Sequence, residues 1–113
     1  MFDSVSSSAI KSALDGLAAR QRATADNIAN LNTPGYTAQR VDFEDALRSA
    51  VSDGTGAATA TTARSTVAPG NDGNNVNLDS ETLISVDAQL RYQLMSQAES
   101  NQFTSIADAL KTS

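Results

Sequence analysis

Few residues in this sequence have the types and spacing that catalysis requires. The segment from Ser8 to Lys11 has the S-x-x-K spacing in which a lysine activates a serine nucleophile for acyl transfer. The companion S-D-N and K-T-G elements are missing, and a chain with fourteen serines gives such a match easily by chance. A hydrolase built on Ser8 is therefore the least favoured interpretation.

The acidic residues do not suggest a second kind of active site. Asp42, Glu44 and Asp45 crowd one short segment, which is typical of a helix N-terminus, where negative charge is favourable. The chain contains no histidine and no cysteine. Zinc fingers, thiol enzymes, disulfide scaffolds and histidine-based catalysts are thereby excluded.

Residues 71–75 have the composition of a calcium-binding loop but not its pattern. If Gly73 takes the sixth loop position, the first and third positions fall on Ala68 and Gly70, which have no side-chain oxygen. This run is therefore interpreted as a turn. We expect no metal ion, no cofactor and no enzymatic activity.

The most distinctive run extends from Asn27 to Tyr36 and reads N-I-A-N-L-N-T-P-G-Y. Its asparagines can bond the free backbone groups of a helix end, and Pro34-Gly35 is typical of a turn. The run contains Asn27, Ile28, Ala29, Asn30, Asn32, Thr33, Pro34, Gly35 and Tyr36. Its composition by itself indicates a helix stop.

The charge pattern excludes some partners. The net charge is −5 and the arginines are dispersed, so neither a nucleic acid nor an anionic membrane surface is expected as a partner. Arg20 and Arg22 are expected on a solvated face. No stretch approaches the roughly 20 apolar residues of a membrane span. The first residues also lack the pattern of a cleaved secretory signal.

Apolar bulk is scarce. The apolar fraction is 40%, but 19 of these residues are alanine. Ordering a residue costs on the order of 1.5 kcal/mol, and a buried large side chain returns roughly 1.5–3 kcal/mol. We therefore expect neighbouring molecules to complete the core.

A first helix is predicted from Ser6 to Leu31, with Ser6 as its cap and Pro34 beyond its end. Its larger apolar residues follow 4-3 spacing and form a narrow seam, as in a coiled coil. These residues are Ile10, Leu14, Leu17, Ile28 and Leu31.

The middle of the chain offers little to bury. A short helix capped by Asp42 is expected before Gly54, and residues 52–75 are rich in Gly, Ala, Thr, Ser and Asn. We interpret that segment as a flexible linker. We expect the chain to divide into an N-terminal axial helix (1–34), a turn and short helix (35–51), the flexible linker (52–75) and a C-terminal axial helix (76–113).

A second helix is predicted from Ser80 to Leu110, with Asp79 as cap. Its apolar residues occupy two sectors, so it should contact more than one neighbour. We expect Leu83, Leu90 and Leu94 to complete the seam within the chain. Four others are expected to face neighbouring subunits, namely Tyr92, Met95, Phe103 and Ile106.

The run from Asn27 to Tyr36 closely resembles the N-terminal signature of bacterial flagellar rod and hook proteins. Within this group the chain is most similar to the FlgB-type basal-body rod family (the proximal rod), on the evidence of Val41-Asp42-Phe43, Asn75-Val76-Asn77-Leu78 and Leu90-Arg91-Tyr92-Gln93. The resemblance covers roughly residues 5–51 and 75–110. The FlgC-type sister subunit is an alternative, although its Ser-Arg-x-Tyr-x-x-Asn pattern is missing.

The resemblance implies an axial structural protein without catalytic activity. Such subunits are exported unfolded through the flagellar type III export apparatus without a cleaved signal and polymerise into a periplasm-spanning rod. Implied partners are other copies, FlgC-type rod proteins, the adaptor FliE and the membrane ring. The expected fold is all-α, with two long terminal helices in an antiparallel coiled-coil-like hairpin that transmits torque.

A soluble helical adaptor or export chaperone is the alternative from another class. Such a protein should be an ordered dimer when pure. A rod subunit should instead be partly disordered at low concentration.

Overall fold

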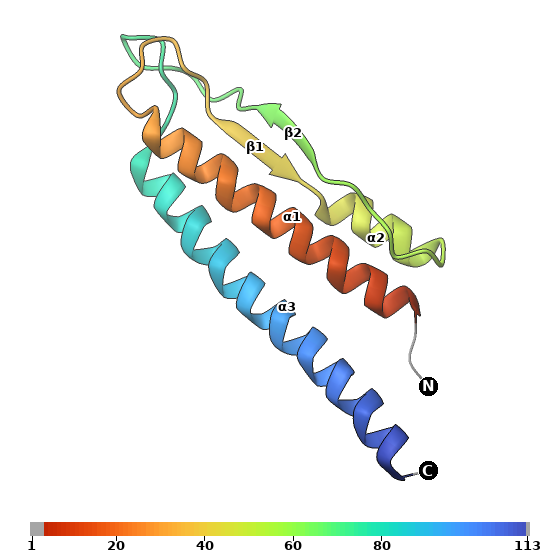
Figure 1. Ribbon diagram of the computed structural model, residues 1–113. Helices are drawn as coiled ribbons and strands as arrows, with labels where there is room; N and C mark the ends of the chain where they lie inside the picture. The colour runs from red at the N-terminus through yellow and green to blue at the C-terminus, as the bar shows by residue number, and fades with distance from the viewer. Residues whose placement is uncertain (1–3, 113) are drawn as a thin grey trace.

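Two long helices, α1 (Ser4–Ala29) and α3 (Leu78–Thr112), run antiparallel and lie side by side in the computed structural model (Figure 1). Strand β1 (Gln39–Asp42), helix α2 (Glu44–Ser52) and strand β2 (Thr61–Arg64) connect them. The structure describes residues 4–112, except for six side chains near the C-terminus: Phe103, Ser105, Ile106, Ala109, Lys111 and Thr112.

Helix α1 is the central element of the molecule. Helix α3 packs on one of its sides, and the β1–β2 pair and α2 pack on the other (Figure 1). The molecule is elongated, with extents of 66 × 25 × 14 Å. Most of the chain therefore lies close to the surface.

The predicted positions of the two long helices are close, but both of their predicted caps are wrong. Helix α1 already includes Ser6, which therefore does not cap it. Asn77, and not Asp79, precedes α3, and its Oδ1 accepts the Ser80 N–H at 3.0 Å. This bond satisfies one of the amides that a helix start leaves free.

The short helix α2 also begins later than predicted. Phe43 occupies its cap position without a side-chain bond, and Asp42 belongs to β1. Glu44 and Asp45 lie in the first turn of α2, as predicted. Their charge favours the positive end of the helix dipole.

The fold is mostly helical rather than all-α, because residues 61–64 pair with 39–42 as an antiparallel ladder. Part of the segment interpreted as a flexible linker, residues 61–64, thus forms a strand in the structure. Ser12 Oγ donates to the Gly56 carbonyl at 3.1 Å and accepts the Ala58 N–H at 3.0 Å. Bonds from distant residues thus order a segment that has little apolar bulk of its own.

The core is small and rich in alanine. Its buried members are Ala13, Leu17, Ala23, Val41, Phe43 and Ala88. Two of the three largest fully buried side chains are polar, Glu81 and Asn27, and the third is Leu17. Polar contacts therefore carry much of the internal packing.

Candidate functional site: a buried polar cluster and an exposed apolar stripe

The signature run ends α1 and turns the chain toward β1. The Tyr36 N–H donates to the Thr33 carbonyl at 3.2 Å, which closes a four-residue turn with Pro34 and Gly35 at its centre. Gly35 has a φ of 76°, which favours glycine at the third position of such a turn. The turn predicted at Pro34-Gly35 is confirmed.

Asn27 binds β1 as a neighbouring strand would. Its Oδ1 accepts the Gln39 N–H at 2.8 Å, and its Nδ2 donates to the Gln39 carbonyl at 3.0 Å. The Tyr36 hydroxyl also donates to Oδ1, at 3.2 Å. The side chain is fully buried, so its amide satisfies the inner edge of β1 where no strand lies.

Glu81 joins the same network from α3. Its Oε1 accepts from Asn27 Nδ2 at 2.7 Å, and its Oε2 lies 2.8 Å from Arg40 Nη2. The Glu81 side chain is 0% exposed. We call Asn27, Gln39, Arg40 and Glu81 the polar cluster. It connects α1, β1 and α3 in one place.

Two further asparagines fasten the segment before α3 to the signature run. Asn74 Nδ2 donates to the carbonyls of Asn30 and Thr33, both at 2.8 Å. Asn75 Oδ1 accepts the Ala38 N–H at 2.7 Å, next to the start of β1. Both residues are buried, so the end of α1 and the approach to α3 form one polar unit.

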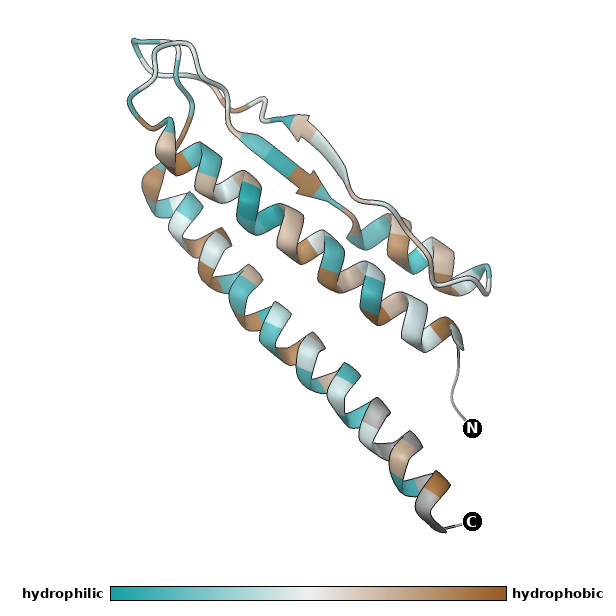
Figure 2. Ribbon diagram, viewed as in Figure 1, coloured by the Kyte–Doolittle hydropathy of each residue, from teal (hydrophilic) through white to brown (hydrophobic). Residues whose placement is uncertain are grey.

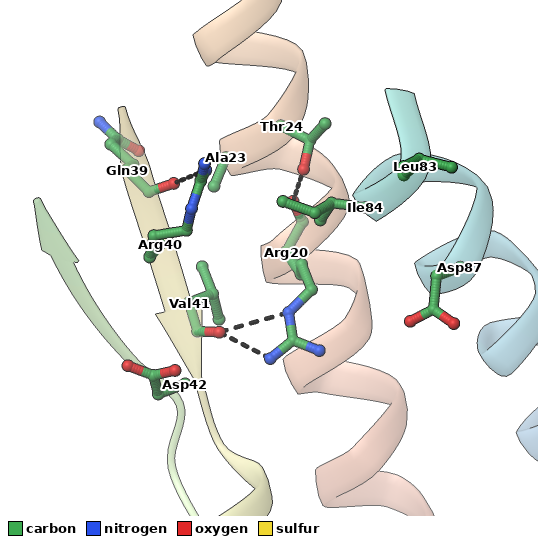
Figure 3. Close-up of a pocket in the computed structure, with 10 residues that line it drawn as sticks. All are labelled: Arg20, Ala23, Thr24, Gln39, Arg40, Val41, Asp42, Leu83, Ile84 and Asp87. Atoms are coloured by element: carbon green, nitrogen blue, oxygen red, sulfur yellow. Dashed lines mark hydrogen bonds between the residues drawn. The ribbon is translucent and has the colours of Figure 1, made fainter. Parts of the chain in front are cut away.

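Arg20 is not on a solvated face as expected, because its guanidinium holds β1 and α2 against α1. It donates to the Val41 carbonyl (Figure 3) and to both oxygens of Glu44, at 2.6 and 2.7 Å. These bonds from Arg20 lower the pKa of the Glu44 carboxyl to about 2. The same bonds raise the pKa of Arg20 above its ordinary value.

The seam residues predicted on α1 are unequally buried. Leu17 is 2% exposed and belongs to the core. Ile10, Leu14 and Leu31 are half-buried, and Ile28 is 37% exposed. The centre of α1 therefore makes the tightest contacts.

The inner face of α3 is not the one predicted. Leu83, Leu90 and Leu94 do not complete the seam within the chain, because they are 72%, 61% and 66% exposed. Ala88 is fully buried in their place, and Met95 packs against the core. The small Ala88 side chain suits a close helix contact that leucine would prevent.

The exposed leucines continue into a stripe with Val86, which is 51% exposed. We call Leu83, Val86, Leu90 and Leu94 the outer stripe. Apolar residues recur along the length of α3 (Figure 2). Tyr92 is 37% exposed, and the side chains of Phe103 and Ile106 lie outside the described residues.

The chemistry available here is that of packing and hydrogen bonding. Among the described residues, no three acidic side chains are placed to hold a metal ion. Within residues 4–112, neither long helix has an apolar stretch sufficient to cross a membrane. The buried polar groups of the cluster hydrogen-bond one another and the backbone, except for Glu81 Oε2, which is held by its ion pair with Arg40.

Sequence reasoning missed Glu81, Arg40, Asn74 and Asn75 as members of a site. The available signal was the position of Glu81, which shares a helix face with Ile84, Ala88 and Met95. An acidic residue on such a face is rarely buried without a partner. Its partners come from distant segments and could not be identified from spacing.

Known proteins are similar in sequence to this chain, both around the signature run and over most of its length. Residues 10–37 match the family model described as "Flagella basal body rod protein". The flagellar basal body rod protein FlgB of Borreliella burgdorferi is 32% identical over 87% of this chain and 90% of its own length. The FlgB of Escherichia coli K12 is 32% identical over 88% of each chain, and that of Borrelia hermsii is 30% identical over 87% of this chain. Since these relatives are 30–32% identical over 87–88% of this chain, the chain belongs to the FlgB family of flagellar basal body rod proteins.

Proposed function

We propose that this structural rod subunit polymerises through α1 and α3 and transmits torque along the proximal rod of the flagellum. The observation that carries this proposal is the outer stripe, since all four of its side chains are more than half exposed. A row of large apolar residues on one helix face favours burial against another protein.

The sparse core supports the same proposal. The buried cluster contains three alanines among its six residues, while the larger side chains of α3 remain outside. A subunit with this distribution gains stability from its neighbours, because each contact removes apolar surface from water. Torque is then carried by interlocked helices rather than by isolated domains.

The family implies assembly with other rod components in the basal body. We propose that the neighbours are further copies of this chain and FlgC-type rod proteins, with the adaptor FliE and the membrane ring at the base. The rod would span the periplasm. We also propose that the chain passes unfolded through the flagellar type III export apparatus without a cleaved signal, which its small core would ease.

Replacement of Leu90 by aspartate tests this proposal. Leu90 is 61% exposed, so Leu90→Asp should leave the folded subunit intact and place a charge in the contact between subunits. In a strain whose only copy carries this change, we expect loss of swimming and of assembled rods, with normal amounts of the exported subunit.

Gln89→Asp is the matched control, because Gln89 is also exposed on α3 but lies outside the outer stripe. It should swim normally. Normal swimming of the Leu90→Asp strain would exclude the outer stripe as an assembly surface. A soluble adaptor, the alternative function, would instead remain in the cytoplasm and be missing from purified basal bodies.

A further inference from the structure

Helix α3 has two apolar faces, and the structure buries the one with smaller side chains. Ile84, Ala88 and Met95 face α1, and Ala88 is 0% exposed. At 100° per residue the outer stripe lies roughly half a turn away, on the opposite face. Apolar burial alone would favour the reverse orientation, because the outer stripe consists of three leucines and a valine.

Glu81 lies on the buried face, close in angle to Ala88. In the reverse orientation its carboxylate would reach water and lose both Asn27 and Arg40. In the observed orientation, Asn27 Nδ2 is 2.7 Å from Oε1, and Arg40 Nη2 is 2.8 Å from Oε2. Both partners are fixed in turn: Asn27 by two bonds to Gln39, and Arg40 by its position in β1.

We propose that the polar cluster acts as a rotational lock that selects which face of α3 packs against α1. Buried polar groups are best known for specifying helix register and orientation, because a misaligned helix leaves them without partners. Here Glu81 has its partners only when Ala88 and Met95 face inward. The apolar seam alone does not determine this rotation, since alanine contacts are small and tolerant of shifts.

The lock has a consequence for assembly. With α3 held in this rotation, the outer stripe stays on the surface instead of being buried within its own chain. That consequence rests on the proposed function of the stripe. The lock itself does not, because it concerns the isolated chain and can be measured without any assembly.

The natural absence of cysteine allows single-cysteine reporters on each face of α3. The purified full-length chain would carry either Ala88→Cys, which reports the buried face, or Leu90→Cys, which reports the outer stripe. Maleimide labelling rates would be compared in the two proteins. We expect the Ala88→Cys protein to be labelled at least tenfold more slowly, and a rate ratio near one would overturn the proposal.

Glu81→Leu is then introduced into both reporter proteins. It removes the carboxylate that meets Asn27 and Arg40, so the ratio of the two rates should reverse even though the new leucine lies on the inner face. Glu99→Leu is the control, because Glu99 lies at a similar helix angle but is exposed. It should leave the ratio unchanged. If Glu99→Leu and Glu81→Leu had equal effects, the lock would be excluded, because loss of a glutamate outside the polar cluster would then produce the same change.

Glu81→Gln covers the case in which Glu81→Leu unfolds the chain, as circular dichroism would show. Glutamine keeps the size of the side chain and an oxygen for Asn27 but removes the charge that faces Arg40. We expect the ratio of the two labelling rates to move toward one by a factor of at least three. An unchanged ratio in every folded Glu81 variant would overturn the proposal.

Discussion

At the scale of single residues, Asn27 does what a β-strand does elsewhere. Its amide bonds both the N–H and the carbonyl of Gln39, so the inner edge of β1 is satisfied by one side chain. If backbone groups were to satisfy this edge of β1, the fold would need an additional strand there. The side chain performs this task within the last turns of α1, where the chain is about to reverse.

Replacement of Asn27 by alanine should therefore be costly. It removes the partners of the Gln39 backbone, the Tyr36 hydroxyl and Glu81 at once, and it leaves buried groups unsatisfied. We expect a loss of about 3 kcal/mol in the free energy of unfolding, as measured by urea denaturation. Asn32→Ala is the control, because Asn32 belongs to the same run but is exposed, and its effect should stay within about 0.5 kcal/mol. Equal effects of the two changes would contradict this role of Asn27.

The sequence predicted the position of these residues but not their task. Three asparagines before Pro34 indicate a helix end, and α1 does end at Ala29. The spacing of residues along the chain contains no information about Glu81, which lies 54 positions from Asn27. The polar cluster depends on contacts between three separate elements and becomes visible only once these are folded together.

At the scale of elements, the helices follow from local periodicity and the sheet does not. The apolar spacing of residues 6–31 and 80–110 predicts two long helices, close to the observed α1 and α3. Each strand has only four residues, and every residue of β2 is exposed. Arg20 and Asn27 bond β1 from outside, and Asn75 bonds Ala38 just before it, so the conformation of β1 depends on distant partners.

The contact between α1 and the start of α2 depends on a glycine. A Cβ on Gly16 would lie 2.4 Å from Cγ of the buried Phe43 ring. Gly16→Ala should therefore reduce the free energy of unfolding by roughly 1–3 kcal/mol, despite the better helix propensity of alanine. Asp15→Ala, at an exposed neighbouring position, should change it little in urea denaturation. A more stable Gly16→Ala protein would show that Phe43 does not pack there.

The ion pair between Arg20 and Glu44 should make stability depend on pH. The folded pKa of Glu44 is lowered from 4.5 to about 2, so its contribution is fully present above about pH 4.5 and is lost as the pH falls toward 2. Because the carboxylate is 39% exposed, solvent screening limits this contribution to roughly 1 kcal/mol. The free energy of unfolding, measured by urea denaturation at several pH values between 2 and 5, should change less with pH for Glu44→Gln than for the natural chain. Equal changes with pH would mean that other carboxyls account for the whole effect.

At the scale of the whole molecule, the rotation of α3 is what the sequence could not predict. Helical periodicity identifies both of its apolar faces, and the face with more leucine resembles the core of a monomer. The structure buries the other face, with Ala88 at its centre and Glu81 near one end. Side-chain size therefore misleads here, because the larger apolar residues of α3 lie on the exposed face, which we propose contacts neighbouring subunits.

Folding and export can be separated with a charge at Leu17. Leu17 is 2% exposed at the centre of the core, so Leu17→Asp buries a charge without a partner and should prevent α1 and α3 from packing. If the chain is exported unfolded, as proposed, this variant should still leave the cytoplasm in nearly normal amounts while rods and swimming are lost. Ala25→Asp, which adds the same charge at an exposed site on α1, should retain both rod assembly and swimming.

Immunoblots of periplasmic and basal-body fractions measure export and rod assembly separately. Normal swimming with Leu17→Asp would contradict the need for this core in the rod, and retention of the variant in the cytoplasm would show that export requires a folded subunit.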